Sequence, residues 1–250
     1  MNKLISFHGK QQIKDKYLKR LKIHYDADQI IKGTYWENGK GCAVGCTVHS
    51  GKHDSFETEL GITWRLAILE DSLFEKLPNK EAKEFPIQFL NAIPVGVDTN
   101  IIFKKFIIWN LTDEKEGLIY HIKNKDEINL LKRVADTYTR SFAEEISERE
   151  WKALADEARS AYTYAYAYAS ASASAYASAS ASAYASASPE WQKIFDERIL
   201  RMRDKLLELL IESGNEESNR KNITKELAIL PVEETSDLKV SAPILMVHGS

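Results

Sequence analysis

The side chains best suited to chemistry lie together in one short segment of the chain. Cys42, Cys46, His49 and His53 follow one another with the spacing Cys-x3-Cys-x2-His-x3-His, and they include both cysteines of the protein. Thiolate and imidazole are ligands that Zn²⁺ prefers, and each pair spacing is acceptable for a zinc site. Zinc fingers usually separate the two pairs by about a dozen residues, whereas only two intervene in this chain. The segment therefore predicts an unusually compact metal site, with zinc as the candidate ion.

A reactive thiol is a second interpretation of the same segment. A cysteine beside a histidine becomes a nucleophile when the imidazole lowers the pKa of the thiol. A carboxylate would orient the imidazole, and the nearby candidates are Glu57, Glu59 and Glu70. A third interpretation is simple packing, because free cysteine is among the most buried residue types. His24 lies on an apolar helix face, which is typical of a hydrogen-bonded core histidine.

The elements around this segment read as helices. Apolar residues recur at helical spacing in most of the chain, and Asp98 is placed to cap one helix. Gly214 is expected to end the last helix. The expected helices cover residues 10–31, 59–77, 79–93, 101–111, 126–142 and 191–213. The stretch 101–111 is apolar on most sides, which predicts the buried centre of the protein. The fold class expected is mainly α, a helical bundle.

Residues 161–188 form a run in which alanine alternates with serine, tyrosine and threonine. Strict alternation is the period of a strand, but a single strand of this length would far exceed those of globular domains. Alanine is the best helix former, and Ser147 and Glu150 upstream have the form of a capping box. The run therefore favours one long helix, with the strand as the alternative.

A tyrosine stripe is expected along that helix. At 100° per residue, four tyrosines fall on one face of a thin alanine and serine rod. Such a rod lets neighbouring backbones approach closely, so we expect self-association or binding of another protein through this face. The residues of this predicted interaction surface are Tyr162, Tyr166, Tyr176 and Tyr184.

Composition changes along the chain indicate three parts. Residues 1–146 would form an N-terminal helical domain that carries the Gly/Cys/His loop, and residues 147–213 the long alanine-rich helix with a closing amphipathic helix. Residues 214–250 contain short apolar runs and prolines. They predict an extended or flexible C-terminal arm.

Overall charge and hydropathy restrict the class of partner. The formal net charge is −3 and the pI is near 6.1, which argues against a dedicated nucleic-acid-binding protein. No stretch approaches the 18 apolar residues of a membrane span, and the N-terminus has no apolar signal region. We therefore expect a soluble, cytoplasmic protein without membrane contact.

Several phrases of the chain resemble a family of uncharacterised bacterial and prophage-associated proteins. They are residues 33–47 (GTYWENGKGCAVGCT), 69–71 (LED), 89–96 (FLNAIPVG) and 204–210 (DKLLELL). Proteins of that family carry an alanine-rich, tyrosine-containing run between an N-terminal region and a closing amphipathic helix. The resemblance covers roughly residues 4–212. It implies no established activity, so it assigns no functional residue.

Two hypotheses follow from the sequence. The first is a helical scaffold or binding protein that associates with itself through the alanine and tyrosine helix. The second is a metal-binding or thiol-dependent enzyme centred on Cys42, Cys46, His49 and His53. The sequence favours the first hypothesis modestly.

Overall fold

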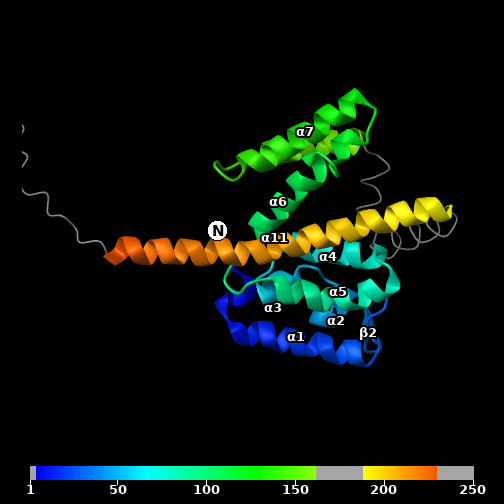
Figure 1. Ribbon diagram of the computed structural model, residues 1–250, viewed down its shortest axis with the longest axis vertical. Coiled ribbons are helices and arrows are strands. Elements are labelled where there is room, and N and C mark those ends of the chain that lie inside the picture. The colour runs from blue at the N-terminus through cyan, green and yellow to red at the C-terminus, as the bar shows by residue number, and fades with distance from the viewer. Residues whose placement is uncertain (1–3, 162–187, 230–250) are drawn as a thin grey trace, which may run out of the picture. The chain divides into compact units, whose positions relative to one another are not determined.

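The computed structural model of this chain describes residues 4–161 and 188–229 (Figure 1). Contacts divide the chain into two compact units, residues 1–215 and 216–250. The described part is mainly helical, as the sequence predicted, with one two-stranded sheet. In chain order the elements are η1 Ser6–Gly9, α1 Gln11–Asp26, β1 Trp36–Glu37, β2 Lys40–Gly41, α2 Ala43–Val48, α3 Ser55–Leu60, α4 Trp64–Lys76, α5 Asn79–Ala92, α6 Thr99–Thr112, η2 Leu118–Tyr120, α7 Lys125–Arg140, α8 Glu148–Ala161 and α11 Pro189–Ile229. None of these helices is long and apolar enough to cross a bilayer.

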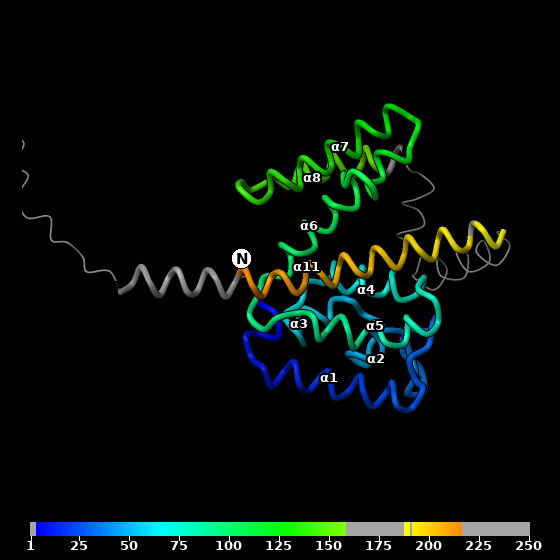
Figure 2. Tube along the Cα trace, viewed as in Figure 1, coloured from blue at the N-terminus to red at the C-terminus, as the bar shows by residue number. Residues whose placement is uncertain are grey.

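The core of the first unit lies among α1 to α5. Helix α5 packs on both α1 and α4, and the short α2 packs on α1 and α4 (Figure 2). Phenylalanine supplies much of the buried volume, because aromatic rings remove large apolar areas from water. Six phenylalanines are fully buried: Phe7, Phe56, Phe74, Phe85, Phe89 and Phe106.

Helix α6 links this core to the α7 and α8 pair (Figure 1). Its N-terminus is capped as expected, since the Asp98 side chain accepts a hydrogen bond from the Asn100 amide at 3.0 Å. The prediction that residues 101–111 form the buried centre is wrong. Only Ile102, Phe106 and Leu111 of that stretch are buried, and its other side chains are half-exposed. The reason is that α6 joins two groups of helices and is not surrounded by them.

The single helix expected over residues 59–77 is two helices. Helix α3 ends at Leu60, and Gly61 adopts a left-handed φ of +64°. A Cβ at Gly61 would lie 2.1 Å from the Ile5 carbonyl oxygen. Glycine is therefore needed both for this φ and for the close approach of the η1 region, and α4 begins afresh after Thr63.

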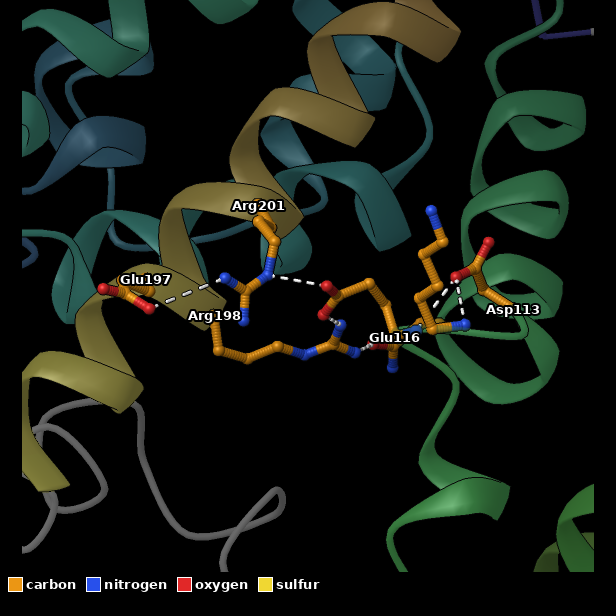
Figure 3. Close-up of polar contacts among 7 residues, drawn as sticks. Asp113, Glu116, Glu197, Arg198 and Arg201 are labelled. Carbon is orange, nitrogen blue, oxygen red and sulfur yellow. Dashed lines mark hydrogen bonds and ion pairs between the residues drawn. The ribbon is translucent and has the colours of Figure 1, made fainter.

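Residues 189–215 of helix α11 belong to the first unit, where an apolar face and two arginines contact the other helices. Ile199, Leu206, Leu209 and Leu210 join the core. Arg198 and Arg201 converge on Glu116 in the turn after α6 (Figure 3). The distances from their guanidinium nitrogens to the Glu116 carboxylate oxygens are 2.6 and 2.8 Å. Arg198 also donates to Asn110 at 2.9 Å. These contacts fix α11 on the turn that Asp113 shapes by accepting from the Lys115 and Glu116 amides.

Gly214 does not end the last helix, contrary to the sequence prediction. Helix α11 begins at Pro189, two residues before the expected start, and continues to Ile229. A Cβ at Gly214 would lie 2.8 Å from Cγ of Pro94, so the glycine serves close packing inside a helix and not termination. The prediction of an extended or flexible tail is therefore wrong for residues 214–229, while residues 230–250 lie outside the described part.

Candidate functional site

The Gly/Cys/His segment folds around the backbone of Tyr35. Residues 36–37 and 40–41 pair as a hairpin, closed by Asn38 and Gly39 with φ of 50° and 79°, the Asn-Gly signature of a tight turn. Within the hairpin and α2, Cβ atoms at Gly41 and Gly45 would lie 2.1 and 1.5 Å from the Tyr35 carbonyl oxygen.

The glycines therefore form a notch that only residues without a Cβ can provide. We call Gly41, Gly45 and Gly51 the glycine notch, since a Cβ at Gly51 would also approach the Tyr35 side chain at 3.1 Å. The notch aims two consecutive aromatic rings at two different histidines. The rings of Tyr35 and His53 meet edge-on, with their centroids 5.7 Å apart. The rings of Trp36 and His49 are stacked, with their centroids 4.3 Å apart.

The two cysteines are free and buried. Burial raises the pKa of the Cys46 thiol to about 12, and this thiol donates to the Gly41 carbonyl oxygen at 3.3 Å. Burial also raises the pKa of Cys42, and the nearby Asp71 charge raises it further. Because the thiolate is the nucleophile, both cysteines are held in the unreactive, protonated form.

His53 faces a carboxylate of α4. Its Nε2 lies 3.3 Å from Oδ2 of Asp71, and the two side chains are 18% and 3% exposed. The orienting carboxylate is therefore Asp71, whereas the sequence suggested Glu57, Glu59 or Glu70. Glu57 accepts from the Trp64 amide instead, and Glu59 accepts from the Tyr17 hydroxyl.

Asp71 is one of two adjacent carboxylates buried in the core. Glu70 has no exposed surface, and neither of its side-chain oxygens has a hydrogen-bond partner among the described residues, nor has Oδ1 of Asp71. Burial raises the pKa of Glu70 well above its usual range, and the Asp71 charge adds to the shift. Buried carboxylates without partners are costly, so this pair marks a functional site more than a structural one.

Glu75 extends the same acidic helix face toward the surface. Its carboxylate accepts from the Gly33 amide at 3.0 and 3.1 Å. Burial raises the pKa of Glu75 to about 7, although the Gly33 amide opposes the shift. We call Cys42, His53, Glu70 and Asp71 the carboxylate centre, with Glu75 at its outer edge.

His49 belongs to a second group, which involves an imidazole in place of a carboxylate. Its Nε2 lies 2.8 Å from Nε2 of His24, and Nδ1 of His24 lies 2.7 Å from Oε1 of Gln29. His24 is buried and hydrogen-bonded, as its place on an apolar helix face suggested. We call His24 and His49 the imidazole pair.

The structure thus distributes the four residues of the Cys/His motif over two centres. Cys42 and His53 belong to the carboxylate centre, His49 to the imidazole pair, and Cys46 bonds to backbone carbonyls. In the described part of the chain no group of three or more His, Cys, Asp and Glu side chains is arranged to hold a metal ion. Zinc binding by Cys42, Cys46, His49 and His53 stays a prediction of the sequence.

The predicted interaction surface cannot be compared with the structure. Tyr162, Tyr166, Tyr176 and Tyr184 lie outside the described residues, so self-association through them also stays a prediction. Sequence reasoning missed Asp71 and Trp36 as site residues, because their roles arise from contacts between α4, the hairpin and α2. The available signal was the glycine spacing, which shows where another backbone approaches closely.

Comparison with models of protein families, with curated proteins and with solved structures gives no match to this chain.

Proposed function

We propose that this protein is an enzyme in which His53 acts as a general base that Asp71 orients. The observation that carries the proposal is the His53 to Asp71 pair at 3.3 Å, set beside the buried Glu70 carboxyl, whose oxygens have no hydrogen-bond partner among the described residues. A base whose second ring nitrogen is held by a carboxylate is the arrangement that hydrolytic enzymes use for proton transfer.

The contact assigns the roles of the two imidazole nitrogens. A carboxylate oxygen can only accept, so Nε2 of His53 carries the proton and donates to Asp71. Nδ1 is then the atom with a lone pair and takes the proton in the reaction. Asp71 would stabilise the imidazolium that forms, and it acts as a positioning residue because it is buried.

The buried neighbours narrow the class of reaction. The Cys42 thiol and the Glu70 carboxyl are both buried, and burial raises the pKa of each. Neither group supplies an accessible nucleophile. The geometry therefore supports a reaction in which His53 removes a proton from water or from the substrate itself, without a covalent thiol intermediate.

The proposal is tested with activated esters and phosphate esters as probes. We expect hydrolysis faster than that by free imidazole at equal concentration, and a loss of about 10²- to 10⁴-fold in His53→Gln, the usual contribution of a general base. Asp71→Asn should lower the rate while leaving probe binding nearly unchanged. His121→Gln, at an exposed histidine, is the matched control.

A wild-type rate equal to that of free imidazole, or equal rates in wild type and His53→Gln, would overturn the proposal. Cys42→Ser provides an internal check on the mechanism. Because the thiol is not the nucleophile, this variant should keep most of the activity, and complete loss would restore the thiol hypothesis.

A further inference from the structure

We propose that the imidazole pair is a binding site for a divalent transition-metal ion of the zinc class, with Nε2 of His24 and Nε2 of His49 as its two protein ligands. This site differs from the four-residue Cys/His set in the sequence and from the carboxylate centre. Its ligands come from the last turn of α1 and from the residue that follows α2, two helices that pack together.

The two nitrogens are already close to the separation that one ion requires. They lie 2.8 Å apart. Zinc to imidazole bonds of about 2.0–2.1 Å at a tetrahedral angle place two ligand nitrogens about 3.3 Å apart. Metal entry therefore requires the two nitrogens to separate by roughly half an ångström and the rings to tilt until both lone pairs point at the ion.

A neighbouring amide holds His24 in the tautomer that binds metal. Oε1 of Gln29 can only accept, so Nδ1 of His24 carries the proton and Nε2 presents its lone pair to His49. Histidine ligands almost always donate their other ring N–H to such an acceptor. Gln29 therefore occupies the position of the hydrogen-bond acceptor that supports a histidine ligand in metal sites.

The orientation of the His49 ring is restrained by an aromatic neighbour. Trp36 stacks on its ring at 4.3 Å and an interplanar angle of 11°, which limits rotation away from His24. Without metal, Nε2–H of His49 donates to Nε2 of His24. On metal binding this proton moves to Nδ1 of His49, so that both Nε2 lone pairs face the ion and no proton is lost from the neutral pair.

The charges around the pair have opposite effects on a cation. The positive charge of Arg20 repels a cation bound at His49, and the negative charge of Glu59 attracts it. Imidazole nitrogens suit zinc, copper and nickel, and His49 is exposed, so water completes the coordination and the ion exchanges readily.

The test is a zinc titration of the purified full chain against a chromogenic chelator at neutral pH. We expect one zinc ion per chain, bound at least tenfold more weakly by His24→Gln and by His49→Gln. His121→Gln should bind as the wild type does. Gln29→Leu removes only the supporting acceptor and should weaken binding about 10-fold to 100-fold. Quenching of Trp36 fluorescence by Cu²⁺, absent in Trp36→Phe, places the ion beside the stacked ring.

His24 is buried, so circular dichroism must show that each variant is folded, and exposed His49 provides the variant least able to disturb the core. Stoichiometric binding that His49→Gln does not weaken would overturn the proposal. So would the absence of zinc binding at 100-fold excess over the protein. Binding that is lost in Cys42→Ser but kept in His49→Gln would overturn it in favour of a cysteine-containing site.

Discussion

His49 and His53 lie four residues apart in the sequence and yet occupy opposite chemical surroundings. His53 meets a buried carboxylate, Asp71, whereas His49 meets a second imidazole, His24, beneath a stacked tryptophan. A carboxylate partner stabilises the protonated imidazole and favours proton transfer. An imidazole partner offers a second neutral nitrogen and favours a transition-metal ion such as zinc.

The partner of each histidine, and not the histidine itself, determines the chemistry expected at each centre. The sequence placed both histidines in one four-residue motif. The fold separates them because Tyr35 and Trp36 are consecutive residues of an extended segment, so that their rings contact different histidines. The glycine notch holds that segment in place, and it is therefore the common support of both centres.

The largest effect is expected from a substitution in the glycine notch, which should disrupt both centres together. In Gly45→Ala the new Cβ would lie 1.5 Å from the Tyr35 carbonyl oxygen, a backbone clash that a side-chain rotation cannot relieve. We expect a loss of about 3 kcal/mol in the free energy of unfolding, at the upper end of overpacking effects. Urea unfolding measures this loss, and probe hydrolysis and zinc binding should fall together.

Gly39→Ala is the matched control for the notch. Gly39 has a φ of +79° but no atom within 4 Å of its added Cβ, so it tests conformational strain without a clash. We expect it to cost only about 1 kcal/mol. Equal losses in the two alanine variants would show that the notch does not support the centres.

The fold was more accessible to sequence reasoning than the site was. Asp98 and Ser147 act as helix caps, the latter accepting from the Glu150 amide at 3.2 Å, because capping depends on residues only a few positions apart. Gly61 and Gly214 were misjudged because their roles depend on Ile5 and Pro94, which are distant in sequence. The Asp71 and His24 partnerships are long-range contacts of the same kind, so spacing alone could not reveal them.

A smaller effect, on the pH dependence of the free energy of unfolding, concerns only the carboxylate centre and Glu75 at its outer edge. The pKa of Glu75 is about 7 in the folded protein against 4.5 ordinarily. The unfolded chain therefore loses this proton at lower pH, and between about 4.5 and 7 the folded protein binds more protons. By linkage, the free energy of unfolding falls as pH rises through this window and levels off above it.

Urea unfolding at pH 4.5, 5.5 and 7 measures this slope in wild type and Glu75→Gln. We expect a shallower slope in the variant, and Glu70→Gln should reduce it as well, since burial also raises the pKa of Glu70. Exposed Glu37→Gln is the control. An unchanged slope in both variants would show that neither carboxyl has a raised pKa in the folded protein. Zinc affinity should not change in either, because the imidazole pair is a separate centre.

The smallest expected effect concerns only the imidazole pair. Arg20 donates to the Thr47 carbonyl oxygen at 2.8 Å, and its positive charge acts on His49. The same charge opposes a divalent cation, so Arg20→Gln should tighten zinc binding by roughly threefold to tenfold, because interactions between solvent-exposed charges contribute up to about 1 kcal/mol. Added salt should reduce the difference, since screening weakens exposed charges.

Arg20→Lys separates charge from packing in this prediction. Lysine keeps the positive charge but not the guanidinium geometry, so its zinc affinity should stay close to that of the wild type. If both variants tighten binding equally, the Arg20 contact with Thr47 restrains the imidazole pair, and the charge argument fails. Probe hydrolysis at His53 should be the same in all three proteins, because a carboxylate and not a second imidazole determines the proton transfer there.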